Sequence, residues 1–206
     1  MNVARVLASA AFAAASTANL CAAERDAGAD AAARVLAEQV CVICHGPGGH
    51  STSPETPSLA AQPYPYLAAK IEWLRNRALA AAADRHVELL GLSLLDDSMV
   101  AALAHYFANQ SAPAAVAGDA ALVAQGEAIY NRGVPEQQLA PCGVCHGVDA
   151  QGLWIFPRLA GQHAAYVEFQ LDKIQQRTRK ARVMHGVIQS MTPQEIKAVG
   201  AYVQSK

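Results

Sequence analysis

Two pentapeptides of this chain contain the residue types that could do chemistry. Each has two cysteines separated by two residues, followed at once by a histidine: Cys41-Val42-Ile43-Cys44-His45 and Cys142-Gly143-Val144-Cys145-His146. This C-x-x-C-H pattern is the attachment signature of c-type haem, in which both thiols add to the haem vinyl groups and the histidine binds iron. The sequence therefore predicts two covalently attached haem c groups, with His45 and His146 as iron ligands.

Two other interpretations of the cysteine pairs compete with haem attachment. Thioredoxin-like redox motifs would need a strand and a βαβ context, and no alternating strand pattern occurs in the chain. A single zinc site built from both pairs would leave His45 and His146 unexplained, although they hold the same motif position. Both interpretations are disfavoured.

The fifth cysteine, Cys21, lies in a segment with the features of an export signal. Residues 1–23 contain Arg5, then an apolar stretch, and end in Cys21-Ala22-Ala23 before a charged run. This pattern predicts a secretory signal peptide cleaved after Ala23 and a periplasmic location. An uncleaved membrane anchor is the alternative, but the stretch is alanine-rich and short for a membrane span.

The chain is internally duplicated. Pro57-Ser58-Leu59-Ala60-Ala61-Gln62 recurs as Pro157-Arg158-Leu159-Ala160-Gly161-Gln162, at an offset of 100 residues. Such self-similarity predicts two copies of one unit, separated by a stretch rich in alanine, proline and glycine. We expect domains at 24–112 and 120–206 with a linker at 113–119. Each unit is too small to bury much surface by itself, so a haem would complete its core.

The elements of both units are predicted to be helices, which makes the fold class all-α. The expected helices are 31–39, 64–77 and 97–109 in the first unit, and 122–131, 164–178 and 193–204 in the second. Thr192, Pro193 and Glu195 form an N-terminal capping signature for the last helix. The near-balance of 16 basic and 17 acidic residues argues against nucleic acid as a partner.

With these motifs in view, the chain resembles the cytochrome c4 family, in which two class I cytochrome c domains are fused. The resemblance runs through C-H-G-P-G-G and P-S-L-A-A-Q in the first half, and through C-H-G-V-D-A-Q-G and F-P-R-L-A-G-Q-H-A-A-Y in the second. It implies an electron carrier without substrate chemistry, each iron being held by the motif histidine and a distal methionine. It also implies redox protein partners: a quinol-oxidising complex or dehydrogenase as donor and a haem-copper oxidase as acceptor, with peripheral membrane association as a further option.

The predicted distal ligand of the second haem is Met184. It lies 38 residues after His146, in an expected loop before the Thr192 cap, where the family places its ligand. Met191 is the alternative, but its position against the final helix favours packing.

The first unit departs from the family pattern. The position equivalent to Met184 is Glu88, and the residues around it include no methionine. His86 is the favoured sixth ligand because neutral imidazole binds haem iron strongly. Met99 and an open or water-bound iron remain as alternatives. This unit has four extra residues, which we expect within the alanine run at 79–83. They would lengthen the loop and so give it more conformational freedom.

Three further expectations concern charge and function. Arg158 is a candidate partner for a haem propionate. The second unit contains a basic run that could steer an acidic partner: Lys173, Arg177, Arg179, Lys180 and Arg182. The charges of the two units agree with this expectation, because residues 24–112 have a net charge of −4 (six basic, ten acidic) and residues 119–206 have a net charge of +2 (nine basic, seven acidic).

Two other functions stay open: a dedicated electron-accepting subunit of a periplasmic dehydrogenase, and a sensor or enzyme using an open first haem.

Overall fold

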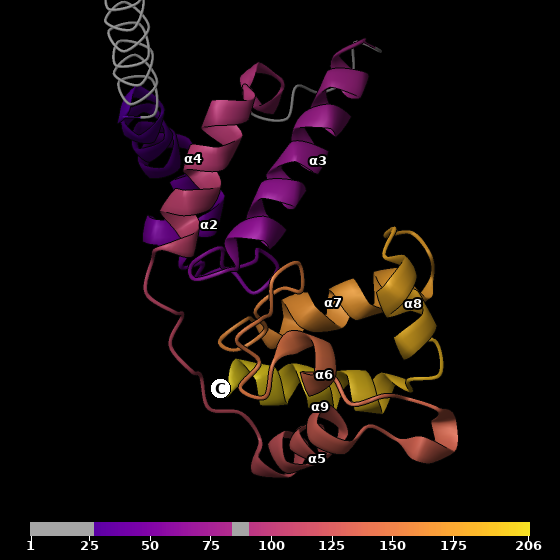
Figure 1. Cartoon of the computed structure of the whole chain (residues 1–206). Coiled ribbons are helices and arrows are strands. Elements are labelled where there is room, and N and C mark those ends of the chain that lie inside the picture. Colours follow the sequence, from indigo (N-terminus) through magenta and orange to yellow (C-terminus); the bar gives the residue numbers. More distant parts are fainter. Residues whose placement is uncertain (1–26, 84–90) are drawn as a thin grey trace, which may run out of the picture.

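A computed structural model describes residues 27–83 and 91–206 of the chain. Within these ranges the backbone is helical apart from its connecting loops, and the only β-type pairings are two isolated bridges. The helices form two groups, one built from residues 27–108 and the other from residues 120–204 (Figure 1). We refer to them as the N-terminal and C-terminal halves.

The N-terminal half packs around a core of small side chains. Its elements are a helix at residues 27–36, a π-helical turn at Ala37–Cys41, the short helix α2 (Val42–His45), α3 (Tyr64–Ala83) and α4 (Asp97–Ala108). The buried cluster between them is rich in alanine and has one aromatic ring: Ala33, Ala37, Leu67, Ala102, Leu103, Ala104 and Phe107. Such a core buries little apolar volume without a further group between the helices.

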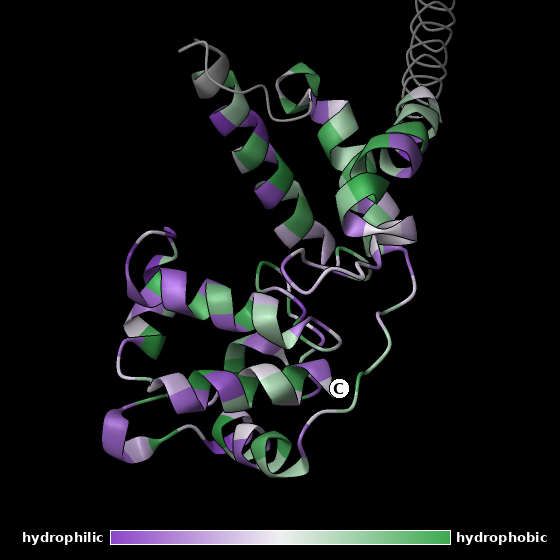
Figure 2. Ribbon diagram, turned by 180° about the vertical axis from the view of Figure 1, so that it is seen from behind, coloured by the Kyte–Doolittle hydropathy of each residue, from purple (hydrophilic) through white to green (hydrophobic). Residues whose placement is uncertain are grey.

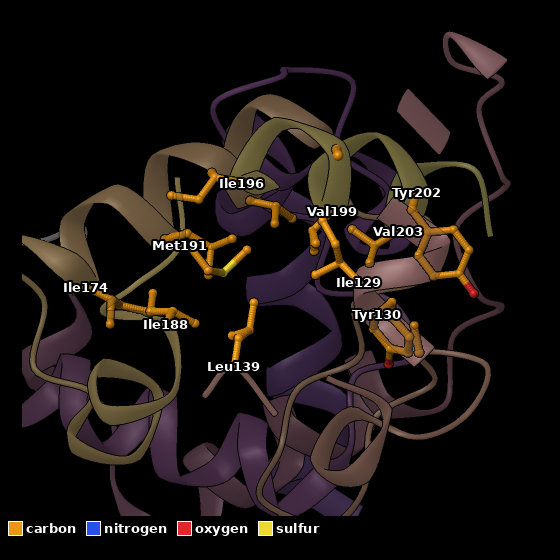
Figure 3. Packing of buried hydrophobic residues seen from close by; sticks show 14 of the residues in the cluster. Ile129, Tyr130, Leu139, Ile174, Ile188, Met191, Ile196, Val199, Tyr202 and Val203 are labelled. Carbon is orange, nitrogen blue, oxygen red and sulfur yellow. The ribbon is translucent and has the colours of Figure 1, made fainter. Parts of the chain in front are cut away.

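The C-terminal half has the larger protein core. It consists of α5 (Ala120–Arg132), α6 (Gly143–His146), α7 (Ala164–Gln175), α8 (Arg182–Ile188) and α9 (Pro193–Gln204). Figure 3 shows Met191, Ile188, Ile196 and Val199 packed together in this core. The buried residues of α9 are apolar or glycine, whereas Gln194 and Lys197 on the same helix are exposed. In Figure 2 the ribbon of this helix has both hydrophobic (green) and hydrophilic (purple) residues.

The crossing of α5 over α9 depends on a glycine. A Cβ atom at Gly126 would lie only 2.0 Å from the carbonyl oxygen of Ala198. The two backbones therefore come closer than any larger residue would allow. This contact fixes the helix that precedes the second haem motif against the last helix of the chain.

Most predicted helices are present, but two expectations were wrong. The final helix begins at Pro193 and ends at Gln204 as predicted, and Thr192 and Glu195 form the expected capping box. The alanine run at 79–83 extends α3 instead of loosening a loop, because alanine is the strongest helix former. Met184 lies in α8 and not in a loop.

Residues 111–119 connect the two halves without regular secondary structure. Within this segment the Val116 N–H donates to the carbonyl of Gln204 at 2.9 Å, which holds the connection against the end of α9. Among the residues that the structure describes, none of the helices combines the length and the apolar character that a membrane span requires.

Candidate haem sites

Each C-x-x-C-H motif forms one helical turn that ends abruptly at a glycine. The turns are α2 and α6, and the glycines Gly46 and Gly147 have φ values of 73° and 84°. A Cβ at Gly46 would lie 2.0 Å from the His50 carbonyl oxygen, so only glycine fits there. The chain turns sharply at this glycine and returns towards the motif histidine. The repeated proline motif therefore lies next to the histidine ring.

Both motif histidines are oriented by the same type of hydrogen bond. His45 Nδ1 lies 2.8 Å from the carbonyl oxygen of Pro57, and His146 Nδ1 lies 2.9 Å from that of Pro157. A carbonyl only accepts, so Nδ1 must carry the proton and donate it. The other nitrogen, Nε2, is then left with a free lone pair, which is the form of imidazole that binds a metal.

The environment of these rings fits an iron ligand. His146 is 4% exposed, and its Nε2 is a buried polar atom with no hydrogen-bond partner. Burial lowers the pKa of both His45 and His146, which keeps the rings neutral. A buried, unpartnered nitrogen would cost free energy unless a further group occupies the space next to it. Haem iron satisfies that atom, so the residues present fit the cofactor.

The four motif cysteines are free thiols at the rim of these sites. Cys41, Cys142 and Cys145 are half-buried and Cys44 is exposed. Burial raises the pKa of the Cys142 thiol to about 11, so it keeps its proton. No group of three or more His, Cys, Asp or Glu side chains converges in the described part of the chain.

The three described methionines near the sites have different environments. Met184 is half-buried on α8 and packs at the edge of the C-terminal core, whereas Met191 is 5% exposed and lies inside that core (Figure 3). Met99 lies in the first turn of α4 and packs against the N-terminal core. His86 and Glu88, which bear on the sixth ligand of the first haem, lie outside the described residues.

Arg158, the predicted propionate partner, has its side chain directed along its own loop. Its Nε donates to the carbonyl of Ala160 at 3.1 Å, and burial lowers the pKa of the guanidinium. The backbone N–H and carbonyl of Arg158 both form hydrogen bonds with the side-chain amide of Gln62 from the other half. The sequence did not reveal the part played by Gln62 and Gln162; their recurrence at an offset of 100 residues was the available signal.

The geometry defines a class of protein. Two helical units each present a histidine with a free Nε2 beside a pair of thiols, which is the ligand set of a dihaem c-type cytochrome. The cytochrome c family matches residues 123–206.

Comparison with known proteins narrows this class. The chain is 34% identical to cytochrome c4 of Pseudomonas aeruginosa, over 86% of this chain and 89% of the relative. The structure of reduced recombinant cytochrome c4 from Pseudomonas stutzeri superposes with a TM-score of 0.74 at 31% identity, covering 86% of this chain and 97% of the other. A thiosulfate dehydrogenase electron acceptor of Thiomonas intermedia is 32% identical over 81% of this chain and 78% of that protein. The chain belongs to the cytochrome c4 family, and it is a dihaem electron carrier with two covalently attached haem groups.

Proposed function

We propose that this protein passes single electrons in the periplasm between a respiratory donor and a terminal oxidase. The observation that carries the proposal is a pair of histidines, His146 buried and His45 half-buried, whose Nδ1 atoms donate to proline carbonyls, which leaves the Nε2 lone pair of each ring available for iron. Rigidly held ligands allow iron to change oxidation state with little rearrangement. The export signal at residues 1–23 and the domain boundaries at 24–112 and 120–206 are part of the proposal.

The ligand sets of the two haems are proposed to differ. Met184 is proposed to complete the second haem, since it is half-buried at the edge of the core, whereas Met191 is enclosed within the core. A thioether opposite histidine stabilises ferrous iron and raises the potential. His86 is proposed to complete the first haem, because neutral imidazole binds haem iron strongly and Met99 lies in the first turn of α4. Arg158 is proposed to pair with a haem propionate.

Low-temperature paramagnetic resonance of the ferric protein tests the ligand sets. We expect one low-spin signal typical of histidine and methionine and a second typical of two histidines. Two histidine–methionine signals would contradict the assignment of His86. A high-spin signal, together with binding of carbon monoxide to the reduced protein, would instead favour an open first haem and a sensor or enzymatic role.

A second candidate function is electron acceptance from a thiosulfate dehydrogenase, which a relative's name specifically favours. The two roles are distinguished by partner kinetics. Purified dehydrogenase with thiosulfate should reduce the protein rapidly if the second role holds. Membranes containing a haem-copper oxidase should oxidise the reduced protein rapidly if the first holds. A protein that fails to react with the oxidase would overturn the first role.

A further inference from the structure

Two glutamine side chains cross between the halves in a reciprocal arrangement. The Ser58 N–H donates to Gln162 Oε1 at 2.9 Å, and Gln162 Nε2 donates to the Ser58 carbonyl at 3.0 Å. In the other direction, the Arg158 N–H donates to Gln62 Oε1 at 2.9 Å, and Gln62 Nε2 donates to the Arg158 carbonyl at 2.9 Å. Each amide thus uses both its acceptor and its donor on one residue of the opposite half.

One bond of each pair ends on the peptide group that orients a motif histidine. The Pro57 carbonyl and the Ser58 N–H belong to one peptide group; its oxygen accepts from His45 and its N–H donates to Gln162. The Pro157 carbonyl and the Arg158 N–H form the equivalent group, between His146 and Gln62. A single peptide therefore connects each histidine to a glutamine from the other half.

Both glutamines and Ser58 lie away from water, at 6%, 5% and 3% exposed for Gln62, Gln162 and Ser58, and Arg158 is half-buried. In such an environment hydrogen bonds polarise one another, so an acceptor placed on a peptide N–H makes the carbonyl of the same peptide a stronger acceptor. A stronger bond from histidine Nδ1 in turn raises the basicity of Nε2.

We propose that Gln162 and Gln62 are positioning residues that set the potential of the haem in the opposite half. Gln162 acts on His45 and Gln62 acts on His146, in both cases through the intervening peptide. A more basic Nε2 favours ferric iron, so each glutamine lowers the potential of the haem across the interface. The inference rests on the proposed roles of His45 and His146 as iron ligands.

The crossed pattern separates this role from simple adhesion between the halves. If the glutamines only held the halves together, replacing either one would disturb both haems alike or neither. His163 provides the matched control, because its Nε2 donates across the interface to the Ser51 carbonyl at 2.8 Å without touching either peptide group. His163→Ala should therefore weaken the contact between the halves while leaving both potentials nearly unchanged.

The test is a redox titration of the holoprotein with Gln162→Met and Gln62→Met, followed by absorption. At a fixed ambient potential, Gln162→Met should lower the ferric-to-ferrous ratio of the first haem about threefold, since cooperative strengthening per bond is modest. For a one-electron couple this is an upward shift of about 30 mV. The second haem should move by a small fraction of this, and Gln62→Met should show the reverse. The shift caused by Met184→Ala assigns the two titration waves.

Gln162→Glu provides a rescue experiment. A protonated carboxyl has one acceptor and one donor and so reproduces the amide's two bonds, whereas an ionised carboxylate can only accept. The potential of the first haem should be close to that of the native protein at low pH and should fall as the introduced carboxyl ionises. Gln162→Met should show no such pH step.

The outcomes distinguish this inference from the proposed function. Intact histidine ligation by paramagnetic resonance with unmoved potentials, or equal shifts of both haems in each variant, would overturn the crossed tuning alone. Absence of histidine from either iron would overturn the proposed ligand set itself. Hydrogen exchange of the Ser58 and Arg158 amides shows directly whether each variant has lost its cross-interface bond.

Discussion

The two haem sites are alike on the side of the motif histidine and differ on the opposite side. On the histidine side, both have the same short helix, the same proline carbonyl and a glutamine from the opposite half. On the opposite side, where we propose the sixth ligands, α7 ends at Gln175 and α8 places Met184 at the core edge, whereas α3 continues to Ala83 and the sequence position that we align with Met184 is Glu88. The repeated motif thus specifies how a haem is attached, and the unrepeated segment is free to set its potential.

The largest expected effect tests whether the second haem owes its potential to Met184. We expect Met184→Ala to lower the potential of that haem by on the order of 0.1 V, because axial ligands are the strongest determinant of haem potential. The other haem should be nearly unmoved, since each half holds its own. Spectroelectrochemical titration resolves the two waves.

Met191→Leu is the control for this comparison. The side chain lies within the C-terminal core, and a swap that conserves volume costs about 1.5 kcal/mol or less. Both potentials should therefore stay near their native values. A large fall in this variant, with none in Met184→Ala, would transfer the ligand role to Met191.

A second comparison concerns the helix that precedes each haem motif. Gly126→Ala should destabilise the protein by about 2–3 kcal/mol, because the new methyl group would meet the backbone of α9. Ala33, fully buried in the corresponding helix of the N-terminal half, should tolerate Ala33→Gly at a cost of about 1 kcal/mol from helix propensity. Denaturant unfolding measures the free energy of unfolding of both variants. Equal losses would show that the two helix contacts tolerate a change of one methyl group equally well.

How much of the fold and of the haem sites can be predicted from the sequence depends on how far apart in the chain the interacting residues lie. The haem motifs and the Thr192 capping box are local signals, and the structure has them as predicted. The difference in length between the two units predicts extra loop residues in the alanine run at 79–83, but these residues extend α3 because alanine favours helix. Gln62 and Gln162 were recognised only as repeats, since a repeat does not reveal that its two copies face each other.

Charge should distinguish the halves by a smaller, kinetic effect. Arg177 and Lys180 are exposed between α7 and α8, and Arg182 is exposed at the start of α8; the three ion pairs found among the described residues do not use them. Reversing all three to glutamate should slow reaction with an acidic partner roughly tenfold at low salt. The difference should shrink as ionic strength rises. Stopped-flow rates that match the native protein at low salt would show that this surface does not steer docking.

The smallest effect concerns Lys70 on α3. Burial, aided by Arg179 and Arg77, lowers its pKa from 10.5 to about 8. The unfolded chain then binds more protons than the folded one between these values, so this group should make stability rise as pH increases from about 8 to 10.5. Lys70→Met should remove that increment, whereas Lys180→Met, at an exposed position, should keep it. Thermal unfolding across this pH range checks the slope.

The glutamine exchange also bears on how such a chain could assemble. Contacts in which residue 58 meets 162 while 158 meets 62 have the form of an isologous interface, where each partner presents the same patch to the other. One copy of the unit, bearing both the proline motif and its glutamine, would thus contain a self-complementary surface. The same pairing could have joined two separate single-haem chains before any connection tied them together. Fusion through residues 111–119 would then have converted a concentration-dependent dimer into a permanent one.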